Sequence, residues 1–434
     1  PESVESLVPA VTEALTGPDA PAMLPAIPAL LEYLVESAHR RNSVQAPPLP
    51  IRQQALDRFL APICTSLLAR PDSLTVLWHL VQQIERLRLY QPGGDDHDAW
   101  LALWTRLQSH TLSVLDTASE AETRRVCFDM STSLWHREAD LVRPALPYIL
   151  ACAVPLRDDD VAWPAALAFV HTLLHDMAQE RRMPELLSIL RATMARVCDA
   201  GPEDVGARLV HSPVLCTPTT LLWRKQLTQH VSAAQSEPMW HDALADAQQH
   251  MSPPTPQLAC ALHVLLLLAQ TRPIVAEVAH LVATCLDLGV EACVCGQAPA
   301  QQRLLAGALR LHTALTVQGA SVPPLPLDAL CRLLGTDSTL PEVRVEVVRA
   351  LCCHAERTHT LPPMPKLPAL VRAGLEGHTV EPGDGQVWGL TAHAQEPVAL
   401  WRLLTTRWAP VVDAHAPETL LNDLAVIFTA TLAP

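Results

Sequence analysis

The sequence has few of the features that produce β-sheets. Stretches in which apolar and polar residues alternate are rare, and the chain has only 4 Phe and 3 Tyr against abundant Leu and Ala. Strands favour aromatic and β-branched side chains repeating every second residue, whereas helices repeat their apolar positions every three or four residues. The second pattern runs through most of this chain. We therefore predict an all-α fold.

Motifs that mark common catalytic and cofactor sites are also missing. The sequence has no phosphate-binding P-loop, no nucleophile elbow, no zinc-protease motif and no Cys-x-x-Cys pair. Gly383, Gly385 and Gly389 lie close together, but their spacing differs from a dinucleotide fingerprint and no strand precedes them. We expect no enzymatic activity, no cofactor, and no catalytic, cofactor-binding or metal-ligating residue.

Two acidic clusters have the composition of cation sites without the spacing. One is the loop formed by Asp95, Asp96, His97 and Asp98, and the other is the run at residues 158–160 (Asp-Asp-Asp). Neither has the spaced ligands and terminal Glu of an EF-hand loop. The aspartate-rich motif of terpenoid cyclases needs a further Asp two residues beyond the pair, which neither cluster supplies. We interpret both as solvated loop or helix-cap acids.

Histidines and cysteines also gather in two places. His171 and His175 lie four residues apart and share a helix face, but no Glu is placed between them as a general base. A zinc site could be assembled from six residues, namely Cys293, Cys295, Cys352, Cys353, His354 and His359. Structural zinc sites usually contain a Cys-x-x-Cys pair, which is absent. We interpret the histidines as a half-buried pair and the cysteines as free thiols.

Charge and hydropathy bear on the class of partner. The net charge of −14 opposes attraction to nucleic-acid phosphates, so we expect such contacts not to dominate. The apolar run at residues 258–269 contains His263 and is too short to cross a bilayer. Apart from the close pairs Cys293–Cys295 and Cys352–Cys353, the 12 cysteines are scattered singly through apolar helical patterns, which favours a reducing compartment, the nucleus or cytoplasm. Because the chain begins with Pro1, we expect it to be a segment of a longer protein.

Helical patterns recur along the chain between proline-rich or glycine-containing breaks. Clear apolar stripes cover residues 4–15, 24–38, 77–84, 258–268 and 275–288. Ser119 and Glu122 have the spacing of a capping box, and Pro341 stands where a helix would begin. Counting the segments between breaks predicts roughly 16 to 18 antiparallel helices of ordinary length.

One part of the chain resembles the second half of a HEAT repeat. The residues that carry the likeness are 333–335 (Leu-Leu-Gly), 341–344 (Pro-Glu-Val-Arg) and 347–351 (Val-Val-Arg-Ala-Leu). They combine a proline-led start, an arginine near the first turn and an Ala-Leu core pair. Several larger breaks recur at intervals of roughly 40 to 50 residues, about the length of such a helix pair. The resemblance implies an irregular HEAT- or armadillo-like α-solenoid over residues 1–434. Weak helical periodicity and two glycines make residues 201–218 a candidate hinge or sub-boundary.

Tryptophan is the most distinctive remaining feature. Trp100 and Trp104 share one helix face, and Trp401 and Trp408 lie two turns apart. In a chain poor in Phe and Tyr they are either large core residues or anchors at a partner surface, where Trp is enriched.

Taken with the absent catalytic motifs, the helical-repeat architecture predicts a protein-interaction scaffold. We expect other proteins or a large complex as partners, within a larger intracellular assembly factor that could be nuclear or nucleolar. The alternatives are a helical repeat similar to nuclear transport receptors, an all-α enzyme without a recognisable motif, and a helical repeat that binds nucleic acid.

Overall fold

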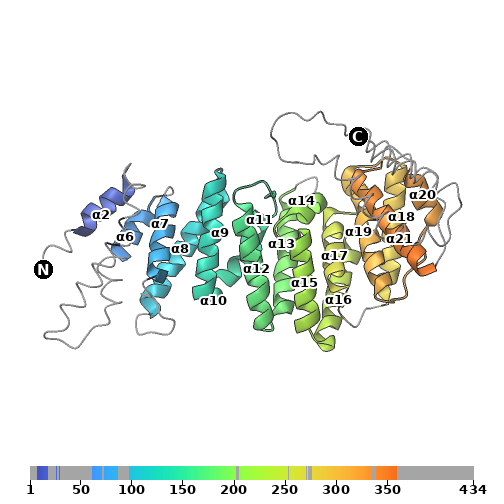
Figure 1. Ribbon diagram of the computed structural model, residues 1–434, viewed down its shortest axis with the longest axis horizontal. Coiled ribbons are helices and arrows are strands. Elements are labelled where there is room, and N and C mark those ends of the chain that lie inside the picture. The colour runs from blue at the N-terminus through green and yellow to red at the C-terminus, as the bar shows by residue number, and fades with distance from the viewer. Residues whose placement is uncertain are drawn as a thin grey trace, which may run out of the picture. The chain divides into compact units, whose positions relative to one another are not determined.

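The computed structural model describes residues 7–17, 26, 29, 61–70, 73–86, 97–201, 205–252, 254–269, 271, 276–334 and 339–358. Within these ranges all regular structure is helical, which confirms the predicted all-α fold (Figure 1). Several predicted features lie outside the described residues: most of the helix at residues 24–38, Asp95, Asp96, the glycines at residues 383–389, His359, Trp401 and Trp408.

The chain forms two compact units. Unit 1 comprises residues 1–176 and 209–220, and unit 2 comprises residues 177–208 and 221–434. The chain passes from one unit to the other within α12 (Trp163–Gln179), α14 (Val205–His211) and α15 (Thr217–His230). Two of these boundaries lie in or just beyond the predicted hinge at residues 201–218, which stays a prediction.

Unit 1 packs its helices mainly against neighbours one or two places away along the chain. Its helices before α12 are α2 (Leu7–Thr16), α6 (Ala61–Leu68), α7 (Leu74–Arg86), α8 (His97–Thr117), α9 (Ala121–Arg137), α10 (Ala139–Val142), the 3₁₀ turn η4 (Arg143–Ala145) and α11 (Leu146–Ala153). Helix α6 contacts α7 and α8, while α9 contacts both α7 and α8. The predicted stripe on α7 faces this interior, since Leu77, Leu80 and Val81 are buried.

Large aromatic side chains fill the centre of unit 1. Trp100 and Trp104 on α8 are both 0% exposed, and their rings stack with centroids 5.3 Å apart. Phe128 on α9 is also fully buried. The guanidinium of Arg137 lies 4.9 Å from the centroid of the Trp104 ring, in cation–π geometry. These two tryptophans are therefore core residues rather than anchors at an exposed surface.

The predicted capping box at Ser119 and Glu122 is wrong. Helix α9 begins at Ala121 with Glu120 as its N-cap, and no side chain caps it. The carboxylate of Glu122 instead accepts hydrogen bonds from Arg125, at 2.6 Å for the closest pair. Arg125 donates to the carboxylate from both Nε and Nη2, a paired contact that a single backbone N–H cannot make.

Unit 2 arranges its helices in two layers. Its helices are α13 (Met183–Asp199), the later part of α15, α16 (Ala233–Gln249), α17 (Pro256–Leu268), α18 (Glu277–Val294), α19 (Pro299–Val317), α20 (Leu327–Leu333) and α21 (Pro341–Thr358). Neighbours pair as α16–α17, α18–α19 and α20–α21; α16, α18 and α20 form one layer, and α13, α17, α19 and α21 the other. This packing is consistent with the predicted helical-repeat solenoid.

Local signals in the sequence set the ends of several unit 2 helices. Proline occupies the first turn of α17 and α19, where its missing N–H leaves no helical bond unmade. Pro341 begins α21, as predicted. Helix α17 carries the apolar run expected to be covered on several sides, and nine of its residues are buried. Among the helices in the described ranges, none is long and apolar enough to cross a membrane.

Candidate binding pocket

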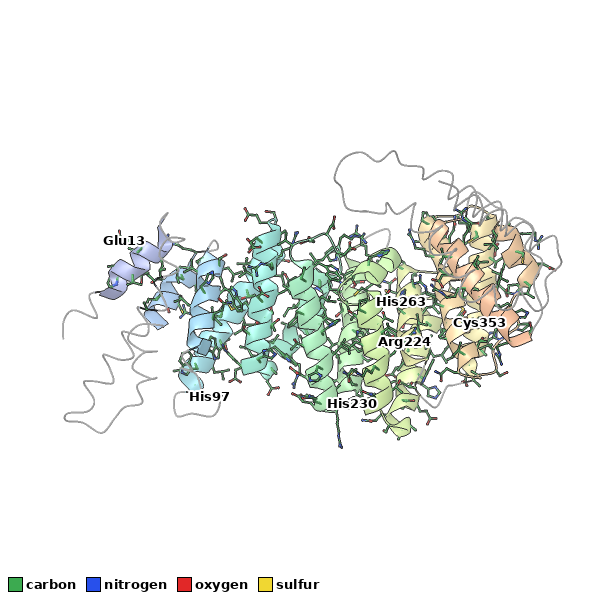
Figure 2. All side chains as sticks on the ribbon, in the orientation of Figure 1. Glu13, His97, Arg224, His230, His263 and Cys353 are labelled. Atoms are coloured by element: carbon green, nitrogen blue, oxygen red, sulfur yellow. The ribbon has the colours of Figure 1, made fainter. Side chains whose placement is uncertain are left out.

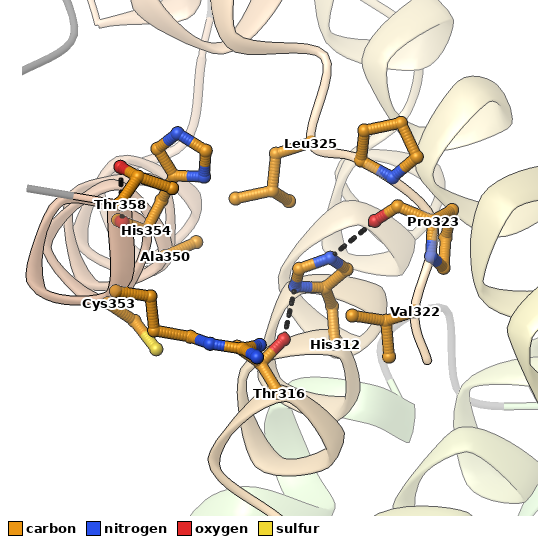
Figure 3. Close-up of a pocket in the computed structure, with 11 residues that line it drawn as sticks. His312, Thr316, Val322, Pro323, Leu325, Ala350, Cys353, His354 and Thr358 are labelled. Carbon is orange, nitrogen blue, oxygen red and sulfur yellow. Dashed lines mark hydrogen bonds between the residues drawn. The ribbon is translucent and has the colours of Figure 1, made fainter. Parts of the chain in front are cut away.

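A cavity of about 300 Å³ lies in unit 2 between α19, the segment that leads into α20, and α21 (Figure 3). The residues that line it are His312, Thr316, Val322, Pro323, Pro324, Leu325, Ala350, Cys353, His354, Arg357 and Thr358. The volume is at the small end of the range for ligand pockets and corresponds to a side chain or a short peptide end.

The end of α19 and the segment after it form the first wall. Gly319 adopts a positive φ of 76°, and its N–H donates to the carbonyl of Thr316 at 3.0 Å. The N–H of Ala320 donates to the carbonyl of Leu315 at 3.1 Å. This pair of bonds is a Schellman motif, which stops the helix and turns the chain. Three prolines (Pro323, Pro324 and Pro326) then restrict the backbone that faces the cavity.

His312 fastens this segment to α19. Its Nε2–H donates to the carbonyl of Pro323 at 2.8 Å, and its Nδ1 accepts from the hydroxyl of Thr316 at 3.4 Å (Figure 3). These partners assign the neutral tautomer with the proton on Nε2. Burial lowers the pKa of His312, and the positive charges of His354 and Arg357 lower it further, although the bond to Pro323 acts in the opposite sense. The ring is therefore a neutral, fixed part of the wall.

Helix α21 supplies the opposite wall. Ala350, Cys353, His354, Arg357 and Thr358 recur at the three- and four-residue spacing that places side chains on one helix face. His354 is partly exposed and Arg357 is exposed, while Cys353 is buried. The Thr358 hydroxyl donates to the carbonyl of His354 at 2.9 Å. This wall thus presents a guanidinium and an imidazole beside a small apolar patch.

A buried ion pair holds the two walls together. The Glu346 side chain on α21 is only 4% exposed, and its Oε1 lies 2.9 Å from Nε of Arg310 on α19. Arg349 also donates to Glu346, at 2.7 Å. Losing either arginine would leave the buried carboxylate with one donor fewer, so this contact favours the way in which α19 and α21 meet.

The character of the pocket follows from its lining. The residues around it include Arg357, His354 and His312 but no Asp or Glu, although the chain as a whole carries a net charge of −14. Val322, Leu325 and Ala350 add apolar surface. The arrangement suits a carboxylate attached to an apolar stem, because guanidinium groups bind carboxylates through paired hydrogen bonds.

The residues weighed as a zinc site are not assembled as one. Cys353 and His354 line the pocket, whereas Cys293 is buried within α18 and Cys295 is exposed at its end. The side chain of Cys352 and all of His359 lie outside the described residues. In the described part of the chain, no three His, Cys, Asp or Glu side chains come together as metal ligands.

The other candidates have structural partners in unit 1. Nε2 of His171 lies 3.1 Å from Oγ1 of Thr219, and burial lowers the pKa of His171. Asp160 accepts a hydrogen bond from the backbone N–H of Ala162 at 2.8 Å and pairs with Arg124 at 3.1 Å. Asp98 lies in the first turn of α8, where a negative charge is favoured by the helix dipole. These contacts fit the interpretation of loop and helix-cap acids.

Sequence reasoning missed His312 and the proline-rich wall. His312 is a lone histidine in an amphipathic helix, and the prolines at residues 323–326 indicate only a break between helices. The spacing of His354 and Arg357 indicates that they share one face of a helix. It does not indicate which other part of the chain packs against that face.

Comparison with known proteins gives no relative from which to transfer a function: no family model, curated protein or solved structure matches this chain.

Proposed function

We propose that this chain is a protein-interaction scaffold within a larger intracellular assembly, and that the α19–α21 pocket holds an acidic anchor of its partner. The observation that carries the proposal is the lining of the pocket, which combines Arg357 and His354 with apolar side chains and contains no acidic residue. A partner carboxylate, from an Asp or Glu side chain or from a chain terminus, complements this lining.

The chemistry of such a contact is simple. The guanidinium of Arg357 can donate two parallel hydrogen bonds to a carboxylate, and His354 adds a further donor when it is protonated or suitably oriented. Val322 and Leu325 would cover the methylene groups that carry the acid. Because binding energy concentrates in a few well-packed residues, a small pocket of this kind can select a partner within a larger helical surface.

Placement in a nuclear or nucleolar assembly factor is part of this proposal by analogy with helical-repeat proteins in general. A role similar to that of nuclear transport receptors is the alternative, and it uses the same kind of surface. Both roles require a stable protein partner, whereas an all-α enzyme would require a small-molecule substrate.

The test is affinity purification of the full-length protein combined with cross-linking mass spectrometry. Three forms are compared: the unchanged protein, Arg357→Glu, and Arg332→Glu as the matched control. Arg332 is exposed on α20 and does not line the pocket, so both variants change the net charge equally. We expect Arg357→Glu to lose the partner by about tenfold or more, because a repulsive pair replaces a favourable one. Arg332→Glu should retain it.

Two results would contradict the proposal. One is the absence of any stable protein partner for the unchanged full-length protein. The other is equal retention of the partner by Arg357→Glu and Arg332→Glu, which would place the binding surface elsewhere. If the unchanged protein retains the partner, the partner's acidic residues are replaced in one variant and its chain terminus is blocked in another. The change that abolishes binding identifies whether the anchor is a side chain or the terminus.

A further inference from the structure

Two cysteines from different helices meet inside unit 2. The Sγ atoms of Cys198 and Cys260 lie 3.5 Å apart, although 62 positions separate the residues along the chain. Cys198 lies in the last turn of α13 and Cys260 near the start of α17, and these two helices pack against each other. Sequence spacing gives no hint of this pairing.

We propose that Cys198 and Cys260 form a reversible disulfide when the protein meets a peroxide or another two-electron thiol oxidant. A disulfide has an S–S distance of about 2.0 Å, so the two sulfurs must approach by about 1.5 Å. Rotations about the Cα–Cβ bonds of the two side chains would supply such a movement. This inference is independent of the proposed partner binding.

A small oxidant has a route to the pair. Cys198 is 8% exposed and Cys260 is 5% exposed, and Cys260 lines a second cavity of about 120 Å³ together with Met194, His250 and Gln257. A cavity of that size has room for a few waters or one peroxide molecule. The pair is therefore screened from bulky thiols but open to peroxide.

The contact between the thiols divides their roles. The hydrogen bond with Cys260 lowers the pKa of Cys198, against the opposing effects of burial and of Asp199. The same contact and burial raise the pKa of Cys260. Cys285, by contrast, is buried and has its pKa raised to about 12 by burial. Since the thiolate is the nucleophile, the lowered pKa and slightly greater exposure of Cys198 favour it as the sulfur that attacks the oxidant first.

The reaction balances in two steps. The Cys198 thiolate attacks one peroxide oxygen, the O–O bond breaks, and the product is the sulfenic acid together with hydroxide, which takes up a proton to become water. The Cys260 sulfur then attacks the sulfenic sulfur, the S–S bond forms, and the S–O bond breaks to release a second water as the thiol proton is lost. Two thiols and one hydrogen peroxide give one disulfide and two waters.

The bond would tie α13 to α17 and close the segment of chain between them. Closing a long loop lowers the entropy of the unfolded chain, so the oxidised protein should melt at a higher temperature than the reduced protein.

The experiment uses the full chain in a Cys295→Ser background, which removes an exposed thiol that could join two molecules. The protein is treated with hydrogen peroxide, alkylated, and digested with chymotrypsin without reduction. Chymotrypsin can cut after Leu258 and Leu262, which separates Cys260 from Cys285. We expect a linked pair of peptides containing Cys198 and Cys260, which dithiothreitol converts back to two free peptides.

The Cys198→Ser and Cys260→Ser variants are the matched controls, and each should lack the linked pair. Quantitative alkylation of both cysteines after peroxide treatment, while partly exposed Cys331 is oxidised, would overturn the proposal. So would a linked pair that joins Cys198 to a different cysteine. A rise in melting temperature on oxidation, reversed by dithiothreitol and absent from both variants, gives a second readout that does not depend on peptide recovery.

Discussion

Helices α8–α12 and helices α17–α21 fill their interiors in opposite ways. The first group packs around Trp100, Trp104 and Phe128, all fully buried. The second group contains no aromatic residue at all, since residues 241–387 lack Phe, Tyr and Trp. Its interior consists of Leu, Val, Ala and Cys side chains together with a few buried polar groups. The interior is therefore filled by large aromatic side chains in one region and by close approach of the helices in the other.

The close contact is clearest between α18 and α19. A Cβ atom added to Gly289 would lie only 2.6 to 2.7 Å from the Cβ, Cα and backbone nitrogen of Leu305. The aromatic-free helices also bury Glu346 and His312 and partly bury His263, whose charges or protons affect stability. The comparison predicts that α8–α12 are sensitive to lost volume, whereas α17–α21 are sensitive to added volume and to pH.

The largest effect is expected from Trp104→Ala in the aromatic region. Removing a fully buried indole leaves a cavity beside Trp100 and should lower the free energy of unfolding by about 3 to 5 kcal/mol. Urea unfolding followed by circular dichroism measures the loss. Trp104→Phe keeps most of the volume and should cost clearly less, so equal losses for the two variants would contradict packing as the cause.

Removing the buried carboxylate of α21 should have the next largest effect. Glu346→Gln leaves Arg310 and Arg349 without their anion, but both guanidinium groups reach solvent, being 24% and 39% exposed. We therefore expect a loss of about 2 kcal/mol, less than for a fully enclosed pair. A Glu346→Gln, Arg310→Gln double variant that loses the same as the sum of the single variants would show that the two groups are not coupled.

Adding one methyl group at the close contact should also destabilise the protein. Gly289→Ala forces α18 and α19 apart at Leu305, and we expect a loss of about 1 to 3 kcal/mol despite the better helix propensity of alanine. Gly307→Ala on α19 is the matched control, because its Cβ would meet Leu262 at 3.4 Å, near ordinary contact. A Gly289→Ala protein as stable as Gly307→Ala would contradict the close approach.

The effect that is smallest at neutral pH is a pH dependence carried by His263 on α17 (Figure 2). Its Nδ1–H donates to the carbonyl of Ala259 at 2.8 Å, while its Nε2 is buried without a partner. Burial lowers its pKa from the ordinary value of 6.5 to about 4, with a smaller contribution from Arg310. The unfolded chain binds the proton more tightly than the folded chain. The free energy of unfolding therefore keeps its full value above pH 6.5 and decreases as the pH falls towards 4.

The slope of unfolding free energy against pH should therefore reach at most about 1.4 kcal/mol per pH unit from this residue. Replacing the ring by His263→Gln should flatten that part of the profile between pH 4 and 6.5. An unchanged profile in the variant would show that His263 keeps an ordinary pKa in the folded protein.

Regular periodicity made the fold predictable, whereas contacts between distant residues did not. The stripe on α7, the apolar run of α17 and the proline at the start of α21 could be read directly, because each depends on residues within one helix. The capping box at Ser119 failed because Arg125 makes a paired contact with Glu122 instead. The pocket depends on α19 meeting α21, which the spacing of residues on either helix alone does not specify.

The same limit applies to the cysteines. The sequence indicated free thiols, and it placed Cys353 and His354 close together on one helix. It could not show that Cys198 and Cys260 share a contact, because 62 positions separate them. Pair contacts at this separation follow from how the helices stack, which a single sequence does not determine.

The most direct test of the scaffold proposal is photo-cross-linking from the pocket itself. A benzoylphenylalanine at position 322, on the lining of the pocket, is activated in the full-length protein with its partners present. The account predicts a cross-link to a partner peptide with an acidic residue or chain terminus close to the linked site, and its loss in Arg357→Glu. Cross-links that persist unchanged in Arg357→Glu, or that never include another protein, would contradict it.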